Sequence, residues 1–309
     1  MKVKDGIIGF AVGDALGVPV EFCSRENLKK NKVTDMQGFG THLQEPGTFS
    51  DDTAMVIATV SSLIEKNGLD FNNIADKYLD WYEMGDFTAN GEVFDIGITV
   101  RQALENWKRN FRQPSGLKDI DSNGNGSLMR VLPLAYYFDD KRILASDRLQ
   151  LIKKFSSITH AHEISCFGCM LYSEFALLLL NDPNPFKAYE LLKSNMNSYS
   201  EIKNEKKIYY RILKENIFEK SQEEIRSTSY IVDTLEAVFW TILTTHSYKE
   251  ATLTAVNLGG DTDTIAALVG GLAGIIYGYE HIPNEWIKTL KRKEYLLKMC
   301  EQYEQELSC

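Results

Sequence analysis

The sequence is poor in cysteine, in basic residues relative to acidic ones, and in long apolar runs. Its five cysteines are an odd number scattered through 309 residues, so we expect reduced thiols and no disulfide framework. Lys and Arg together number 34 against 43 Asp and Glu, which gives a formal net charge of −9 and argues against a general nucleic-acid or membrane-surface binder. The first residues, MKVKDGIIGFAVGDALG, lack the continuous apolar stretch of a secretory signal, so we expect a cytoplasmic protein.

The longest uncharged stretch, from Thr264 to Tyr279, has 16 residues, of which four are glycine. This length is too short for a comfortable membrane span, so we expect a buried helix in a soluble protein. Hydrophobic residues make up 44% of the chain and charged residues 25%, which is typical of a globular protein with a large core.

Apolar residues recur at helical spacing almost everywhere and period-two alternation is scarce, so we predict an all-α chain. No Pro/Gly/Ser-rich linker and no repeat divides it, and we expect one domain over residues 1–309 with a polar peripheral segment at about 195–226. The predicted helices cover residues 6–16, 53–66, 74–83, 99–112, 127–138, 147–158, 162–180, 185–193, 203–220, 230–245, 248–256, 263–279 and 285–304.

Two predicted helices carry small residues four apart. The first has Gly9, Gly13 and Gly17, and a late one has Ala266, Gly270, Gly274 and Gly278. Each set forms a stripe without large side chains along one helix face, which lets another backbone approach closely. Because a glycine inside a helix costs about 0.5–1 kcal/mol relative to alanine, we expect a compensating close crossing of central helices.

Polar side chains gather in four segments that lie in loops or at helix starts: residues 13–22, 46–55, 123–130 and 257–271. Two of them carry clustered acids, SDDT at 50–53 and GGDTDT at 259–264. Asp52 and Asp263 could simply cap helices, but capping needs one carboxylate for each helix and not pairs. If the two loops meet, four carboxylates share one site, and like charges that close cannot all stay ionised without a cation.

The ligand types narrow the choice of cation. DSNGNG at 121–126 resembles the start of a calcium loop, but its twelfth position is Leu132 where a bidentate Glu is required. Carboxylates and hydroxyls without clustered histidines suit Mg²⁺ or Mn²⁺ better than zinc. A zinc site at His162, Cys166 and Cys169 lacks a fourth ligand, so we expect buried thiols there. His160 stands between two predicted helices, where it either has a structural role or contacts a ligand.

Four motifs, GDALGVPVE, PG followed by SDDTAM, NGNGSLMR and NLGGDTDT, with ITHAH between the last two, carry a family signature. Over roughly residues 5–280 the chain resembles an ADP-ribosylglycohydrolase, the family of the dinitrogenase-reductase-activating glycohydrolase and the vertebrate ADP-ribosyl-acceptor hydrolases. The resemblance implies a compact single-domain orthogonal helical bundle. It also implies two divalent cations, Mg²⁺ or Mn²⁺, at the bottom of a cleft that takes ADP-ribose.

The resemblance also implies roles for individual residues. Implied metal ligands are Ser50, Asp51, Asp52, Asp261, Asp263 and Thr264, with Asp263 bridging the two cations. Implied catalytic residues are Glu21, Asp95 and Asp263, and implied substrate contacts are Asn125, Gly126, Ser127, Met129 and His160. Two positions depart from the family pattern: Ser50 stands where threonine is usual, and Ile98 where nitrogenase-reactivating relatives carry asparagine.

The activity implied by the resemblance is hydrolysis of the bond between ribose C1″ and an acceptor side chain, with arginine the first choice of acceptor. We expect the substrate to be an ADP-ribosylated protein and the enzyme to be a monomer that binds no nucleic acid. Two other functions fit the acidic motifs: a non-catalytic ADP-ribose or nucleotide binder, and a two-metal nucleotide phosphohydrolase.

Overall fold

The computed structural model describes residues 2–109, 115–197 and 204–307, and these form helices with isolated β-bridges but no strand. This confirms the prediction of an all-α fold. The α-helices are α1 (Val3–Gly17), α2 (Arg25–Lys30), α3 (Asp51–Lys66), α4 (Phe71–Met84), α5 (Ile98–Arg109), α6 (Leu132–Asp140), α7 (Ala145–Ser156), α8 (Glu163–Asn181), α9 (Pro185–Asn197), α10 (Glu205–Ile208), α11 (Tyr210–Leu213), α12 (Ile231–Thr244), α13 (Tyr248–Val256), α14 (Thr262–Tyr277), α15 (Asn284–Thr289) and α16 (Lys293–Leu307). Short 3-10 helices are η1 (Val18–Val20), η2 (Ile217–Glu219), η3 (Gln222–Glu224) and η4 (Tyr279–His281).

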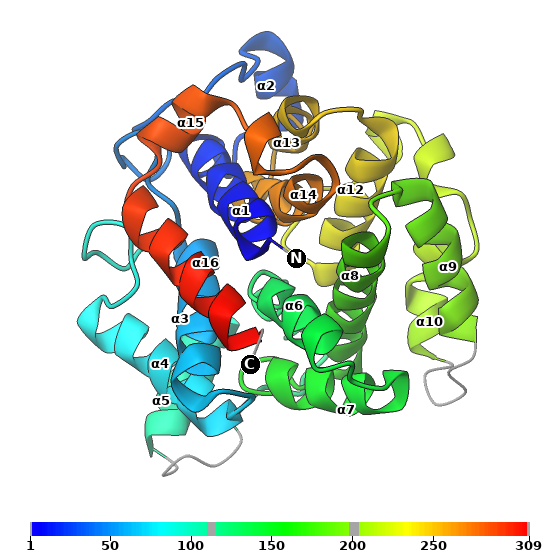
Figure 1. Ribbon diagram of the computed structural model, residues 1–309. Coiled ribbons are helices and arrows are strands. Elements are labelled where there is room, and N and C mark those ends of the chain that lie inside the picture. The colour runs from blue at the N-terminus through cyan, green and yellow to red at the C-terminus, as the bar shows by residue number, and fades with distance from the viewer. Residues whose placement is uncertain (1, 110–114, 198–203, 308–309) are drawn as a thin grey trace.

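Helices α1 and α14 form the centre of the fold and lie side by side in Figure 1. Their glycines face each other across the contact. A Cβ added to Gly9 would lie 2.4 Å from the carbonyl oxygen of Gly270, and one added to Gly13 would lie 2.0 Å from that of Ala266. Real Cβ atoms do not come this close to backbone, so the predicted close crossing is confirmed at these positions. We call this contact the glycine seam.

The glycine seam also positions acidic residues. At its end a Cβ on Gly17 would lie 2.3 Å from the Cα atom of Asp263. The backbone that carries Asp263 therefore lies directly against α1, and Asp14, three residues before Gly17, faces the same region. Both acids are buried, with exposures of 0% for Asp14 and 1% for Asp263.

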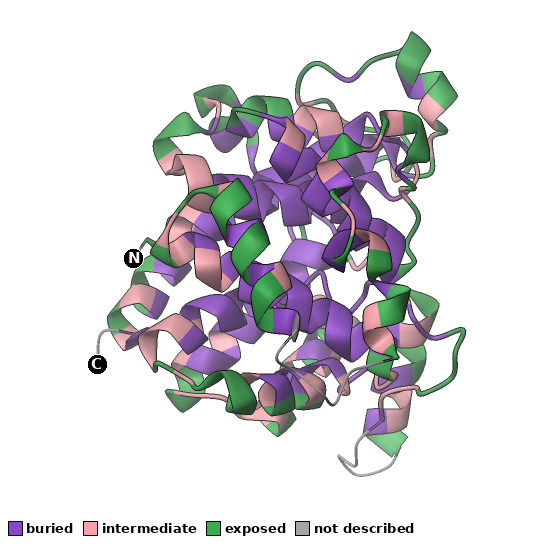
Figure 2. Cartoon of the chain, turned by 90° about the vertical axis from the view of Figure 1, so that its right-hand side faces the viewer, coloured by how far each residue is buried: buried purple, intermediate pink, exposed green. Residues whose placement is uncertain are grey.

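The remaining core surrounds this pair of helices. In Figure 2 buried residues occupy the middle of the molecule and exposed ones its periphery. Helix α8 is the one described helix long and apolar enough to cross a membrane, but 78% of its apolar window is buried inside the fold. The uncharged stretch from Thr264 to Tyr279 begins in α14 and is buried as far as Gly274, whereas residues 275–279 are half-buried. Cys23, Cys166, Cys169 and Cys300 are free thiols.

Two predicted helices differ from the structure for local reasons, and one short helix lies outside the predicted ranges. The helix predicted at 127–138 begins only at Leu132, because Pro133 favours a first turn. The segment predicted as one helix at 285–304 is divided into α15 and α16, and Arg292 between them adopts φ +54°. Helix α2 was not predicted; Ser24 caps it by accepting a hydrogen bond from Asn27 N (3.2 Å).

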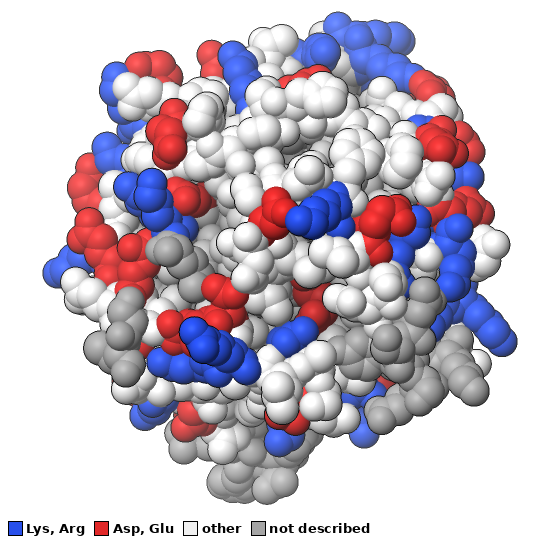
Figure 3. Space-filling model, turned by 45° about the vertical axis from the view of Figure 1, so that its right-hand side comes forward, with Lys and Arg blue, Asp and Glu red and all other residues white. Residues whose placement is uncertain are grey.

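The helix predicted at 203–220 is divided into α10, α11 and η2, and the described part of this segment packs more closely than its charge suggests. The hydroxyl of Tyr189 donates to the carbonyl of Ile212 (2.5 Å), which ties α11 to α9. Tyr209 and Ile217 are fully buried. Charged residues of this segment therefore remain at the surface while its apolar residues pack against the core. On the face in Figure 3, acidic and basic side chains are interspersed.

Candidate active site

A cavity of about 450 Å³ opens beside the ends of α1, α3 and α14, a size suitable for a nucleotide-sized ligand. It brings together segments that lie far apart in the chain. Its lining consists of Glu21, Phe22, Asp51, Asp95, Ile96, Gly97, Ile98, Thr99, Val100, Asp121, Gly124, Asn125, Gly126, Met129, His160, Ser229, Asp261 and Thr264. Nine of the residues predicted as catalytic, substrate-binding or metal-binding therefore line one cavity.

The start of α3 delivers the first acidic pair. Ser50 is the N-cap, and its hydroxyl accepts a hydrogen bond from Asp52 N (3.3 Å). Asp51 lines the cavity, whereas Asp52 is 1% exposed and lies beneath it. Ser50 thus performs a capping function, and its oxygen keeps a second lone pair for another partner.

Asp14 is a buried acid of the site to which the sequence analysis assigned no role. Its carboxylate accepts hydrogen bonds from Ser50 N (2.9 Å), Thr53 N (3.0 Å) and the Thr53 hydroxyl (2.6 Å). Burial raises its pKa to about 6, although these hydrogen bonds act in the opposite direction. An acid in the middle of an otherwise apolar helix was the signal that could have identified it.

The loop before α14 delivers the second acidic pair. Gly260 has φ +74°, and a Cβ there would lie 2.1 Å from the carbonyl oxygen of Ser227, so this tight approach requires glycine. Asp261 N donates to the same carbonyl (2.9 Å). The side-chain amide of Asn125 donates to Asp261 Oδ2 (2.8 Å), which holds the carboxylate toward the cavity. Asn125, predicted to contact substrate, therefore also orients an acid.

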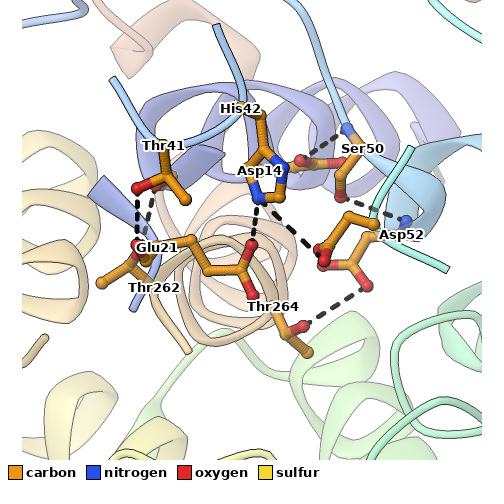
Figure 4. Close-up of polar contacts among 10 residues, drawn as sticks. Asp14, Glu21, Thr41, His42, Ser50, Asp52, Thr262 and Thr264 are labelled. Atoms are coloured by element: carbon orange, nitrogen blue, oxygen red, sulfur yellow. Dashed lines mark hydrogen bonds and ion pairs between the residues drawn. The ribbon is translucent and has the colours of Figure 1, made fainter. Parts of the chain in front are cut away.

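The two acidic loops meet. One oxygen of each carboxylate lies within 4.8 Å of the others in two sets, Asp14 with Asp52 and Asp263, and Glu21 with Asp261 and Asp263. Asp263 belongs to both sets. Thr264 lies beside them and donates to Asp52 (3.5 Å), as Figure 4 shows.

Several of these carboxylate oxygens have no hydrogen-bond partner. They are Asp52 Oδ2, Asp261 Oδ1 and both oxygens of Asp263, all buried. Burial, reinforced by neighbouring acids, raises the pKa values of Asp51, Asp52 and Asp263 well above the usual range for Asp. Unpaired buried carboxylates are costly unless they are protonated or bound to a cation. This set of hard oxygen donors fits divalent cations of the Mg²⁺ or Mn²⁺ type.

Glu21, His42 and Asp95 form a second polar group at the mouth of the cavity. His42 Nε2 lies 2.5 Å from the Glu21 carboxylate and 4.0 Å from that of Asp95, and Figure 4 shows the ring pointing toward Glu21. Burial and nearby acids raise the pKa of Glu21 to about 8 and that of Asp95 to about 7. Two carboxyl groups that titrate near neutral pH are suited to general acid and base work. His42 lies in a loop without a recognisable motif, so no sequence pattern pointed to it.

The segment 123–130 and His160 form the opposite wall of the cavity. Gly124, Asn125, Gly126 and Met129 line it, as does the ring of His160. Burial, followed by the charge of Arg130, lowers the pKa of His160 to about 3, so this imidazole is neutral. Its Nδ1 lies 2.8 Å from the Thr159 hydroxyl, which leaves Nε2 as the second polar atom of the ring.

Arg130, Ser127 and the cysteines stand behind that wall. The guanidinium of Arg130 donates to Gly126 O (3.0 Å) and the Thr159 hydroxyl (2.8 Å), which ties the wall together. The Ser127 hydroxyl lies in a buried network with Ser156 (2.9 Å) and Cys169 (3.3 Å) and does not line the cavity. Cys166 and Cys169 are buried thiols as expected, and the His162 ring caps α8.

In its described residues the protein is all-helical, with a buried carboxylate centre beneath a nucleotide-sized cavity. A model of the ADP-ribosylglycohydrolase family matches residues 1–308, and the chain belongs to that family. The resemblance inferred from the four motifs is thereby confirmed.

Relatives across the family support the assignment. The chain is 32% identical to the ADP-ribosylarginine hydrolase Tri1 of Serratia proteamaculans, over 97% of this chain and 78% of that protein. It is 28% identical to the ADP-ribosyl-[dinitrogen reductase] glycohydrolase of Rhodospirillum rubrum, over 94% and 91% respectively. Among solved structures, an ADP-ribosylglycohydrolase-related protein complex superimposes with a TM-score of 0.83 at 26% identity, covering 99% of this chain and 98% of that one. This chain is an ADP-ribosyl hydrolase by class.

Proposed function

We propose that the protein removes ADP-ribose from modified arginine side chains by a reaction that depends on two divalent cations. The observation that carries the proposal is the set of buried, unpartnered carboxylate oxygens on Asp52, Asp261 and Asp263. Asp51, Ser50 and Thr264 complete the proposed ligand set. Cations bound there would neutralise the acids and bind ribose hydroxyls. They would also lower the pKa of a bound water toward neutral, so that hydroxide is available for attack.

The residues around this centre have separate proposed tasks. Glu21 and Asp95 face the cavity with raised pKa values of about 8 and about 7, so each can hold or accept a proton during cleavage at ribose C1″. Their negative charge, once ionised, favours an oxocarbenium-like transition state. Asn125, Gly126, Met129 and neutral His160 line the cavity and are proposed to bind the rest of ADP-ribose. Ser127 is proposed to act only through its backbone, since its side chain lies outside the cavity.

Arginine is the proposed acceptor for two reasons. The relative with 32% identity is named an ADP-ribosylarginine hydrolase. The Asp95 carboxylate is also partly accessible, with 20% side-chain exposure, at the cavity mouth, where an ionised acid attracts a guanidinium. Ile98 is 85% exposed at the same mouth. Its place in the cavity lining gives this enzyme an apolar contact there.

The test is release of free ADP-ribose from ADP-ribosyl-arginine, with ADP-ribosyl-serine as the competing substrate, before and after a chelator. We expect hydrolysis of the arginine linkage that a chelator abolishes and Mg²⁺ or Mn²⁺ restores. Asp263→Asn should lower the rate by more than about 100-fold, because it removes an acid shared by both carboxylate sets. Asp5→Asn is the matched control, since Asp5 is a partly buried acid on α1 that hydrogen-bonds Tyr279 N (3.1 Å) outside the site.

Other outcomes would assign a different function. ADP-ribose binding without turnover of either substrate indicates a non-catalytic binder. Release of AMP or phosphate in place of ADP-ribose indicates a nucleotide phosphohydrolase. Full activity in Asp263→Asn contradicts the proposed centre.

A further inference from the structure

Three large apolar side chains, one on the cavity lining and two on a loop that reaches one of its acids, are exposed to solvent. Phe22 is 69% exposed, Phe39 58% and Leu43 77%. Phe22 itself lines the cavity, and Phe39 and Leu43 belong to a loop, residues 38–46, that contacts the cavity's acids. We call the three residues the apolar rim and residues 38–46 the rim loop.

The apolar rim is held in an unfavourable backbone conformation. Phe22, Phe39 and Leu43 have φ values of +62°, +69° and +55°. Non-glycine residues rarely adopt this left-handed region, and bulky ones least of all. Each residue of this kind costs about 1–3 kcal/mol and persists only when its surroundings hold it. Strain and apolar exposure thus coincide on the same three residues. Both features destabilise the folded enzyme when no partner is bound.

Backbone contacts fix the rim loop on the residues that lead to Glu21. Thr41 N donates to Pro19 O (2.9 Å), and the Thr41 hydroxyl donates to Glu21 O (2.7 Å). A Cβ on Gly40 would lie 1.8 Å from Pro19 O, so the loop presses directly on η1. These contacts therefore hold the loop in a fixed position against residues 19–21.

Adjacent residues of this loop face opposite ways. His42 points inward to the Glu21 carboxylate, and its ring lies 6.1 Å from that of Phe22 and 5.3 Å from that of Phe94, measured between centroids. Leu43, the next residue, is among the most exposed large apolar residues of the described chain. The rim loop therefore reaches the cavity through His42, whereas Leu43 beside it extends into solvent.

We propose that the apolar rim docks the acceptor protein, which presents apolar side chains beside its modified arginine. The inference rests on the proposed function: ADP-ribose bound in the cavity remains covalently attached to the acceptor, so that protein must lie over the mouth. Docking buries the three exposed side chains, which accounts for their exposure in the free enzyme.

The experiment compares one small and one large substrate. ADP-ribosyl-arginine needs only the cavity, whereas a pool of soluble proteins labelled by an arginine-specific ADP-ribosyltransferase also reaches the rim. The variants are Phe39→Asn and Leu43→Asn, because asparagine tolerates positive φ and removes the apolar surface. For the protein pool we expect kcat/KM to fall about 5- to 10-fold through KM, with unchanged hydrolysis of ADP-ribosyl-arginine. Leu144→Ser is the matched control, since Leu144 is 68% exposed and does not line the cavity.

Each other result overturns the proposal. Unchanged kcat/KM for the protein pool shows that the rim makes no docking contact. An equal loss on both substrates shows that the loop acts on the active site itself. A wild-type dimer that Leu43→Asn converts to a monomer shows that a second copy covers the rim. If the wild type hydrolyses neither substrate, the proposed function fails first, and that failure is visible without any rim variant.

Discussion

The glycine seam and the rim loop differ in packing and in exposure to solvent, although both position residues of the same site. Along the seam, α1 and α14 approach so closely that a Cβ on Gly13 would lie 2.0 Å from backbone, and everything there is buried. In the rim loop, bulky residues adopt positive φ and extend into solvent. The seam therefore fixes the geometry of the carboxylates, whereas the rim presents a surface that has no partner in the free chain.

The two regions have different proposed tasks: the glycine seam supports the catalytic carboxylates, and the apolar rim contacts the acceptor protein. The proposed cation site needs carboxylates held in a rigid frame, and close backbone packing supplies that frame. A surface that contacts another protein needs exposed apolar side chains at fixed positions. Substitutions in the seam should therefore affect stability and all substrates, and substitutions in the rim only large substrates.

The largest expected effect comes from breaking the seam. Gly13→Ala places a methyl group against the Ala266 carbonyl, so α1 and α14 must separate. We expect the free energy of unfolding to fall by about 1–3 kcal/mol or more. Activity on every substrate should be lost as well. Urea unfolding followed by circular dichroism measures the first quantity.

Gly97→Ala is the control for this substitution, because its nearest heavy atom would lie 3.9 Å from the new Cβ. It should leave the free energy of unfolding within about 0.5 kcal/mol of wild type. Equal stability of both variants would show that the helices do not depend on the close contact.

A smaller effect should come from the link between the two regions, His42. Its ring lies 2.5 Å from the Glu21 carboxylate, and we expect it to hold that group in position. His42→Ala should lower kcat on ADP-ribosyl-arginine about 10-fold, and His42→Gln should recover much of the loss because the amide still donates a hydrogen bond. Steady-state kinetics with KM measured separately checks this. A rise in KM alone, without rescue by glutamine, would contradict a positioning role.

The comparison also explains what the sequence could predict. The acidic pairs and the glycine stripes are local patterns, and both led to the correct neighbourhood. Asp263 lies beside Asp52 in one carboxylate set and beside Asp261 in the other, and Gly13 and Gly17 allow the crossing that brings its backbone against α1. The all-α class followed from periodicity. His42 could not be found this way, since it reaches Glu21 only through the folding of the rim loop.

One error in the predicted helices has the same origin in tertiary contacts. The helix predicted at 203–220 is divided where its apolar residues pack against the core, and there Tyr189, a residue of another helix, donates to Ile212 O. Ser127 stays a predicted substrate contact through its backbone, since its side chain bonds to Ser156 and Cys169. Local sequence patterns therefore predicted the central helices well and the directions of individual side chains less well.

The central claim, that the seam holds carboxylates for cations, predicts a specific dependence on pH. The pKa values of Asp14, Asp95 and Glu21 are raised to about 6, about 7 and about 8 by burial. Without cations the folded protein keeps these protons while the unfolded chain releases them, so stability is lost as pH rises from about 5 to about 8. Bound cations take the place of the protons, so their stabilising effect grows over the same range.

The most direct measurement is the melting temperature of chelator-treated protein with and without MgCl2 at about pH 5 and about pH 8. We expect the metal-free melting temperature to fall at the higher pH and Mg²⁺ to raise it most there. Asp263→Asn should be more stable than wild type without metal at about pH 8 and respond little to Mg²⁺. A wild type whose melting temperature rises with pH in the chelator, or ignores Mg²⁺ at both values, would contradict the account.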